Sequence, residues 1–278
     1  MNQPLVSVCI PAYNNADYIG ETIECILKQT YRNLELIIVD DNSKDYTLEI
    51  ICGYADKDAR VKIYHNEKNL GMSGNWNYCL SLCEGEFIKL ICADDILAPE
   101  AIEREVQALL ENPSAVMVES DTKLIDLAGK GKGFYKRYPV KGLVSGKKVT
   151  RRGFFNKDYF GAPQANTFRK EAYQKIGGFD AKYTYILDYD FFAEMAKLGD
   201  IYIIHEPLNF FRVRGDSNTG QVMGDDKEKT NIYVAEHRYL LEKNKDELRL
   251  SELEIEISVL IRRFRCFAAS IYLKLFVR

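Results

Sequence analysis

Four aspartates follow two apolar, β-branched runs of this 278-residue sequence: Asp40 and Asp41 after LELIIV, Asp94 and Asp95 after FIKLIC. Neighbouring carboxylates raise each other's pKa unless a cation or a hydrogen-bond donor intervenes. A divalent metal carrying a diphosphate resolves this conflict, because Mg²⁺ and Mn²⁺ bind carboxylates together with phosphate oxygens. The alternative is that these aspartates cap the helices that follow them. Capping explains one of the two pairs more readily than it explains both together.

The elements that would position these aspartates alternate in type along the first 120 residues. Apolar periodicity predicts strands at 5–10, 34–39, 61–64, 87–92 and 115–119, and helices at 17–29, 45–55, 71–83 and 99–111. This order predicts an α/β fold, a mostly parallel twisted sheet with helices on both faces. Ligands of such sheets bind beyond the carboxyl ends of the strands, where both aspartate pairs would lie.

The rest of the chain is less regular. We expect an irregular connection or small hairpin at 123–149, a helix at 188–198, a strand at 201–204 and a turn-prone loop at 215–220. From about residue 225 the chain is predicted to be helical. We therefore expect a catalytic domain at 1–220, with a nucleotide-binding half at 1–122 and an acceptor-side half at 123–220, and a C-terminal helical extension at 221–278.

Composition and short motifs exclude several classes of protein. The net charge of −3 provides no basic field for nucleic acid. Seven cysteines, an odd number without a C-x-x-C pair, indicate reduced, buried thiols rather than disulfides or a zinc site. With no signal-peptide pattern and no apolar run of about 18 residues, we expect a cytoplasmic protein. The loop PAYNN after the first strand lacks glycine, which argues against a nucleotidyltransferase or a dinucleotide-dependent oxidoreductase.

A series of motifs, each weak alone, resembles in its order the family 2 glycosyltransferases, which share the GT-A fold. The motifs are VSVCIPAYN at 6–14, VDDNSKD at 39–45, NLG at 69–71, LICADD at 90–95, GGFD at 177–180 and LDYD at 187–190. The resemblance covers roughly residues 4–217 and leaves the C-terminal tail outside. It implies an inverting, metal-dependent transferase.

The resemblance implies a donor site in the first half of the chain. The nucleotide would lie against Pro11, Ala12, Tyr13, Asn14, Asn75 and Asp94. Asp40 or Asp41 would hydrogen-bond the base, usually uracil. The cofactor, Mg²⁺ or Mn²⁺, would be held by Asp95 and Asp94. The diphosphate would meet Arg212 and Arg214, because a fixed guanidinium can bind it directly.

The resemblance also implies where the chemistry happens. Asp188 would be the general base that deprotonates the acceptor hydroxyl. Gln164 and Asn166 would bind hydroxyl groups of the acceptor or sugar, with turn roles equally open. The expected reaction moves one sugar from a nucleoside-diphosphate donor, such as a UDP-sugar, to a saccharide or lipid-linked acceptor in bacterial surface-polysaccharide assembly. The sequence contains no Q-x-x-R-W segment. Its absence argues against a processive synthase and for the addition of single sugars.

Three positions depart from the pattern of the family. Cys92 stands where the first aspartate of the metal motif is common, Leu187 replaces a glutamate, and Arg214 stands where a histidine is common. These departures favour one alternative, a catalytically degenerate GT-A-fold protein that binds glycan or nucleotide. Against it, Asp95 and Asp188 are both retained.

The tail carries a separate signal. Ser251 and Glu254 are spaced as a capping box. An apolar stripe follows at Ile257, Leu260, Ile261, Phe264, Phe267, Ala268, Ile271 and Leu275, and every charged residue from Arg262 onward is basic. A basic amphipathic helix predicts peripheral contact of 251–278 with the inner face of the cell membrane. Packing on the catalytic domain or on a homodimer partner remains equally open.

Overall fold

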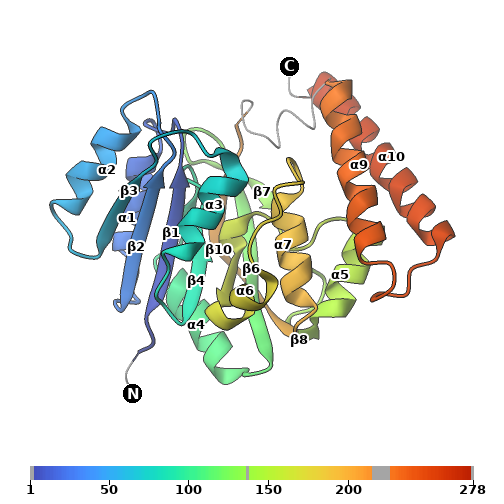
Figure 1. Cartoon of the computed structure of the whole chain (residues 1–278), viewed down its shortest axis with the longest axis horizontal. Helices are drawn as coiled ribbons and strands as arrows, with labels where there is room; N and C mark the ends of the chain where they lie inside the picture. Colours follow the sequence, from blue (N-terminus) through green and yellow to red (C-terminus); the bar gives the residue numbers. More distant parts are fainter. Residues whose placement is uncertain (1–2, 136–137, 215–225, 277–278) are drawn as a thin grey trace.

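The computed structural model describes residues 3–135, 138–214 and 226–276 of the chain. The predicted loop at 215–220 and the predicted domain boundary after 220 lie outside the described residues. A ten-stranded sheet runs through the described part, in the order β3-β2-β1-β4-β9-β6-β10-β5, with β7 beside β6 and β8 beside β10 (Figure 1).

The first half of the chain forms the parallel part of this sheet. Its strands are β1 (Val6–Ala12), β2 (Leu34–Asp40), β3 (Val61–His65) and β4 (Phe87–Leu90). Its helices are α1 (Ile19–Leu27), α2 (Thr47–Ala55), α3 (Gly71–Ser81) and α4 (Ala101–Glu111). All eight agree closely with the sequence-based expectation, because apolar runs mark the strands and the helical spacing of apolar residues marks most of the helices.

The second half makes the sheet mixed. A long parallel pair, β6 (Ala115–Ile125) and β10 (Asp200–Arg212), lies toward the end of the sheet opposite β3. Short antiparallel strands join it: β5 (Ile96–Leu97), β7 (Gly131–Tyr135), β8 (Gly142–Ser145) and β9 (Asn166–Arg169). The α/β class is confirmed, although fewer pairings are parallel than expected. Both long strands extend beyond their predicted ends. Their last residues form segments without a clear apolar pattern, which become strand because β6 and β10 pair with each other.

Helices cover both faces of the sheet, as predicted. Helices α1, α2 and α4 pack on one face, and α3, α5 (Gly146–Phe155), α6 (Lys170–Ile176) and α7 (Leu187–Ala196) pack on the other. Alternate residues of β1 serve the two faces: Val8 and Ile10 are buried against the first group, and Cys9 against the second. Burial of each large aliphatic side chain contributes about 1.5–3 kcal/mol of stabilisation.

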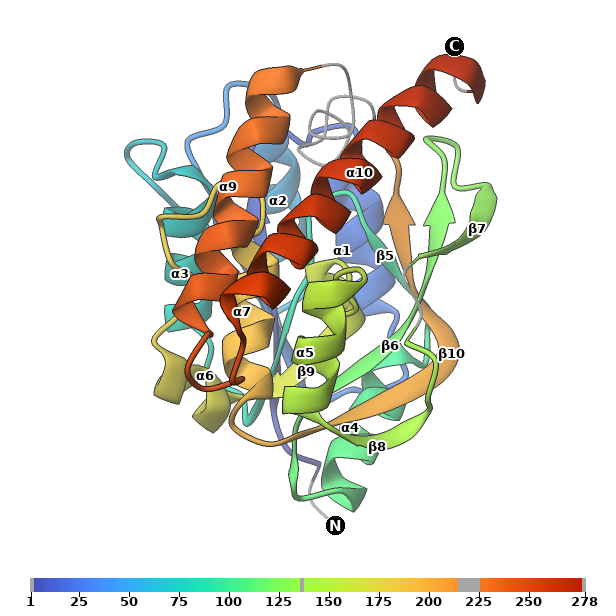
Figure 2. The same ribbon diagram turned by 90° about the vertical axis from the view of Figure 1, so that its right-hand side faces the viewer.

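The C-terminal extension consists of α9 (Lys227–Lys243) and α10 (Glu252–Phe276), which lie beside α7 and α5 (Figures 1 and 2). The predicted capping box forms, since Ser251 N–H donates to Glu254 Oε2 at 2.8 Å and Glu254 N–H donates to Ser251 Oγ at 3.3 Å. Leu240 and Ile255 belong to the same hydrophobic core as Phe191 of α7. The extension therefore completes the core of the domain instead of forming a separate unit.

Helix α10 has an inner and an outer side. Ile255 and Val259 are buried against the domain, whereas Leu260, Phe264 and Phe267 of the predicted stripe are 63%, 69% and 62% exposed. Across the described ranges, no helix combines the length and the apolar character needed to cross a bilayer. All seven cysteines are free thiols.

Candidate functional site

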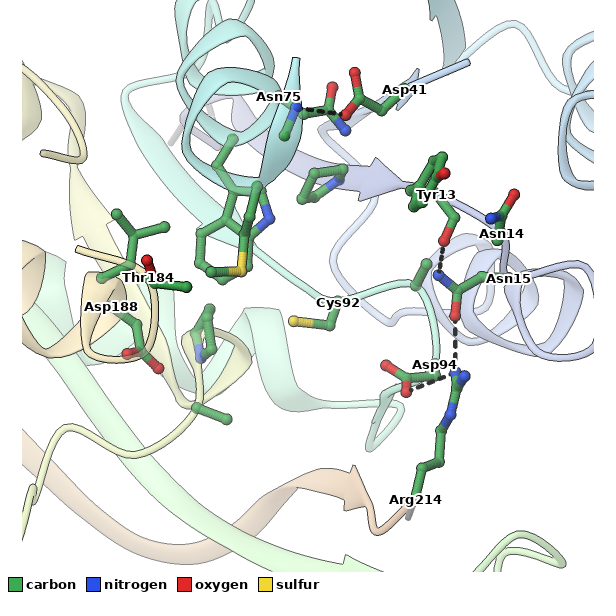
Figure 3. Close-up of a pocket in the computed structure, with 18 of the residues that line it drawn as sticks. Tyr13, Asn14, Asn15, Asp41, Asn75, Cys92, Asp94, Thr184, Asp188 and Arg214 are labelled. Carbon is green, nitrogen blue, oxygen red and sulfur yellow. Dashed lines mark hydrogen bonds and ion pairs between the residues drawn. The ribbon is translucent and has the colours of Figure 1, made fainter. Parts of the chain in front are cut away.

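A pocket of about 620 Å³ opens beyond the carboxyl ends of β1, β2 and β4, as expected for this class of sheet (Figure 3). Loops after these strands, the start of α3, the end of β10 and the start of α7 supply its walls. The residues that line it and that matter below are Pro11, Tyr13, Asn14, Asn15, Asp41, Met72, Asn75, Trp76, Cys92, Asp94, Ala162, Pro163, Thr184, Tyr185, Leu187, Asp188, Arg212 and Arg214.

The loop after β1 forms one end of the pocket, and Tyr13 is 45% exposed there. Asn14 adopts a φ of 50°, and its Oδ1 accepts a hydrogen bond from Lys44 N at 2.8 Å. Asparagine tolerates this left-handed conformation better than most residues. Ala12, in contrast, is fully buried in β1, and it does not reach the pocket.

The two aspartates after β2 have different environments. Asp41 lines the pocket, and its carboxylate accepts hydrogen bonds from Leu70 N at 2.8 Å and Gly71 N at 3.1 Å, at the amino end of α3. Gly71 takes a φ of 73°, where glycine is favoured. Asp40 is buried outside the pocket, with Oδ2 3.0 Å from Nδ1 of His65. The structure thus places Asp41 alone of this pair at the pocket.

One side of α3 forms the next wall. Asn75 is buried at the pocket, and its Nδ2 donates to the carbonyl oxygen of Val39 at 3.3 Å. Met72 and Trp76 also line the pocket, and the Trp76 ring meets Phe179 edge-on at 5.1 Å. Sequence analysis assigned neither residue to the site. Met72 and Trp76 are four residues apart, and Met72 is three residues before Asn75; this helical spacing was the available signal.

The two aspartates after β4 also differ in their environments. Asp94 lines the pocket, with Oδ2 3.1 Å from Nη1 of Arg214. Burial raises the pKa of Asp94, and Arg214 opposes that shift. Asp95 is fully buried outside the pocket, where Oδ1 accepts a hydrogen bond from Arg212 N at 2.9 Å. Burial, and then the charge of Asp94, raise the pKa of Asp95 well above its usual value.

The two arginines at the end of β10 differ in their contacts. Arg212 is 2% exposed and donates to Glu21 Oε2 at 2.6 Å and to the carbonyl oxygen of Asp94 at 2.9 Å, so it braces the loops. Both arginines line the pocket, and Arg214 donates to Asn15 Oδ1 at 2.9 Å and to Asp94 Oδ2 at 3.1 Å. Both guanidinium groups lie over the ring of Tyr18, at 5.1 and 4.8 Å from its centroid.

Asp188 lies in the first turn of α7 at the opposite side of the pocket from Asp94, and Cys92 lies between them (Figure 3). Burial raises the pKa of the Cys92 thiol well above its usual value, and the charges of Asp95, Asp94 and Asp188 add to that shift. A protonated thiol is therefore the state expected between the two carboxylates.

Gln164 and Asn166, expected on the acceptor side, do not line the pocket. Both are fully buried, in the short 3₁₀ helix η1 (Pro163–Ala165) and in β9, and Asn166 Nδ2 donates to the carbonyl oxygen of Phe160 at 2.7 Å. Their neighbours Ala162 and Pro163 line the pocket instead. The sequence locates this segment, but which side chains point outward depends on how η1 packs on the sheet.

The pocket offers few protein ligands for a metal ion. Among the described residues, no three His, Cys, Asp or Glu side chains gather in a way that could hold an ion. Mg²⁺ and Mn²⁺ in phosphate sites are typically held by one or two carboxylates, with phosphate oxygens and waters as further ligands. Asp94 supplies one such carboxylate, so the site fits a metal that arrives with a diphosphate.

Comparison with known proteins identifies the family. Residues 7–177 match the family model described as glycosyl transferase family 2. The chain belongs to this family. The predicted family and the predicted class of enzyme, a glycosyltransferase, are thereby confirmed. An uncharacterized glycosyltransferase of Haemophilus influenzae is 32% identical over 169 residues, which cover 61% of this chain and 61% of that relative.

Solved structures of other glycosyltransferases share the fold. S. aureus TarS 1–349 in complex with UDP-GlcNAc superposes with a TM-score of 0.71 at 19% identity, covering 98% of this chain and 76% of that one. The mannosyltransferase PcManGT from Pyrobaculum calidifontis, in complex with GDP-Man and Mn²⁺, has a TM-score of 0.62 at 16% identity, covering 99% and 76%. At these identities the likeness establishes the GT-A fold of this family 2 chain.

Proposed function

We propose that this family 2 glycosyltransferase moves a single sugar from a nucleoside-diphosphate sugar, with UDP as the preferred nucleotide, to a hydroxyl of a saccharide or lipid-linked acceptor. One observation carries the proposal. One pocket is lined by Tyr13, Asp41 and Asn75, by the charged pair of Asp94 and Arg214, and by the carboxylate of Asp188 on the other side of Cys92. Nucleotide sugars bound to fold relatives support the choice of donor class.

The arrangement suits inversion at the anomeric carbon. As the acceptor oxygen bonds to that carbon, Asp188 accepts the proton of the hydroxyl. The bond from the carbon to the diphosphate oxygen breaks, and its electron pair leaves with the nucleoside diphosphate. Because Asp94 and Asp188 lie on opposite sides of Cys92, attack would come from the face opposite the leaving group. Attack from that face inverts the configuration.

The leaving diphosphate needs positive charge nearby. Arg214 supplies a guanidinium at the pocket, suited to a phosphate oxygen, and its contact with Asn15 Oδ1 orients it. A divalent metal at Asp94 would neutralise further charge on the diphosphate when bound. Cell-surface polysaccharide synthesis is the setting that we propose for the reaction.

The first test compares wild type with Asp188→Asn. We expect nucleoside-diphosphate release from a UDP-sugar and acceptor to fall by about 10³-fold, within the range for loss of a general base. Binding of UDP with Mn²⁺, measured as a rise in melting temperature, should be retained. Asp246→Asn, at an exposed position on the loop between α9 and α10, serves as control. Nucleotide binding without turnover in the wild type would instead indicate the degenerate, binding-only alternative.

We also retain the proposal that α10 contacts the membrane surface, with a cytoplasmic, peripheral location. The outer side of α10 presents Leu260, Phe264 and Phe267, and Arg263 and Arg265 are exposed on the same segment. Apolar side chains beside cations suit an anionic bilayer. Co-sedimentation with anionic vesicles tests this, and a concentration-dependent dimer without vesicle binding would favour the homodimer alternative.

A further inference from the structure

A glutamate of α9 is bound to the loop that precedes α7. Glu236 is only 9% exposed, and its carboxylate accepts hydrogen bonds from three consecutive backbone N–H groups. The distances are 2.6 Å from Thr184 N, 2.9 Å from Tyr185 N and 3.2 Å from Ile186 N. Hydrogen bonds to an ionised acceptor are about twice as strong as neutral ones, so Glu236 holds this loop firmly.

The loop in question forms part of the pocket. Thr184 and Tyr185 line it, and two residues after Ile186 the chain reaches Asp188. Ile186 is the N-cap of α7 and makes no side-chain capping hydrogen bond. Backbone donors before the helix therefore depend on an acceptor from elsewhere, and α9 supplies it from about fifty residues further along the chain.

The same helix holds α7 at a second point. Lys243 follows Glu236 by seven residues, which is two helical turns and the same side of α9. Its Nζ lies 2.7 and 3.0 Å from the two oxygens of Asp190 and 3.3 Å from Oε1 of Glu194. Asp190 is 2% exposed, and burial raises its pKa while Lys243 opposes that shift. The acidic Glu236 thus fixes the loop before α7, and the basic Lys243 fixes the body of α7.

We propose that Glu236 is a positioning residue for sugar transfer, acting through the 184–186 loop to orient Asp188. The inference rests on the proposed role of Asp188 as the base. It makes the C-terminal extension part of the catalytic apparatus, although the family model ends at residue 177. A general base must lie within hydrogen-bond reach of its proton, so a loosened loop lowers turnover while the donor site stays intact.

Amide hydrogen exchange tests the contact itself, whatever Asp188 does. In Glu236→Gln the side-chain NH₂ group cannot accept, so we expect faster exchange of the 184–186 amides and unchanged exchange around Asp41 and Asp94. Glu242→Gln is the matched control, because Glu242 lies on α9, has a half-exposed side chain and places Oε1 3.8 Å from Nη1 of Arg238, away from the 184–186 loop. Equal exchange of 184–186 in wild type and Glu236→Gln would overturn the proposal.

Kinetics test the positioning role. We expect Glu236→Gln to lower kcat by 10- to 100-fold with the donor KM within twofold, and Glu236→Asp to restore part of the loss. In the Asp188→Asn background Glu236→Gln should cause no further fall, because two residues that act as a unit are not additive. An unchanged kcat, or a fall of equal size in both backgrounds, would overturn the inference. Full activity of Asp188→Asn alone would instead refute the proposed function.

Should Glu236→Gln unfold, Glu236→Asp carries the same test. It keeps the charge but shortens the reach by one methylene, so the loop contacts lengthen while the buried anion stays. A cooperative unfolding transition close to that of wild type must accompany any kinetic effect. A kcat fall that follows the loss of stability, and is recovered at lower temperature, would mark Glu236 as structural only and overturn the proposal.

Discussion

The two halves of the molecule place their pocket residues by different means. In residues 1–122, Asp41 directly follows β2 and Asp94 lies in the loop after β4, so their position follows from the order of elements. In the later part, Asp188 lies on α7, whose loop is held by Glu236 of α9, and Gln164 is turned into the interior. Local sequence sets the first half of the site, and contacts between distant segments set the second.

This difference has a physical origin. A parallel β-α unit fixes which end of the strand carries the ligand side, whatever the rest of the chain does. A segment of short elements such as 158–186 has no sustained apolar period, so its side chains face inward or outward according to the neighbours they meet. Differences between expected and observed side-chain placement are therefore expected in the second half, and buried Gln164 and Asn166 are the instances.

Of the three tests of this comparison, the one with the largest expected effect concerns the first half. Asp94→Asn keeps the shape of the side chain but removes the pocket-facing charge beside Arg214. We expect transfer to fall on the order of 100-fold and the Mn²⁺-dependent part of the UDP-induced rise in melting temperature to disappear. A variant that keeps its metal dependence would show that another carboxylate, such as the buried Asp95, binds the metal after a rearrangement.

A smaller effect concerns the extension. His237 Nε2 lies 2.9 Å from Ser258 Oγ, which donates to the carbonyl oxygen of Phe154. Burial, and then the charge of Arg262, hold the pKa of His237 well below its usual value. Below about pH 6.5 the unfolded chain binds a proton at this histidine that the folded chain does not, so acid lowers the free energy of unfolding by up to about 1.4 kcal/mol per pH unit.

Denaturant unfolding between pH 8 and 5 measures this contribution. The variant His237→Gln cannot titrate there, so the stability of wild type relative to the variant should decrease as the pH falls below about 6.5. Acidic groups elsewhere change both proteins alike and cancel in the difference. Parallel curves over the whole range would mean that His237 is protonated in the folded state, or exposed, and that α9 is less tightly packed.

The smallest expected effect concerns the buried position of Gln164 in the second half. Gln164→Met keeps the length of a side chain that is fully buried and does not line the pocket. We expect kcat and the KM values for donor and acceptor to stay within about twofold, because a residue without substrate contact removes no binding energy. A tenfold rise in the KM for donor or acceptor would indicate that Gln164 contacts substrate after all. The two halves would then differ less in how well the sequence predicts their site residues.

Most of the fold could be predicted from particular patterns. The apolar run before Asp40 and the helical spacing of Ile19, Ile23 and Ile26 defined elements that the structure confirms. The motif order gave the family, whose resemblance implied Tyr13 and Asn75, and the strand-end pattern pointed to Asp41 and Asp94; all four line one pocket. The full length of β10 could not be predicted, because its partner strand β6 lies about 85 residues earlier in the sequence.

By itself, the sequence determined the α/β class, the family and the residue types available for chemistry, because periodicity and strand-end motifs are local properties. The tertiary structure alone decided which member of each aspartate pair faces the pocket, since Asp40 and Asp95 turn inward to meet His65 and Arg212. It also decided that α9 holds the loop before Asp188. Those outcomes depend on side chains brought together by folding, and no spacing along the chain encodes them.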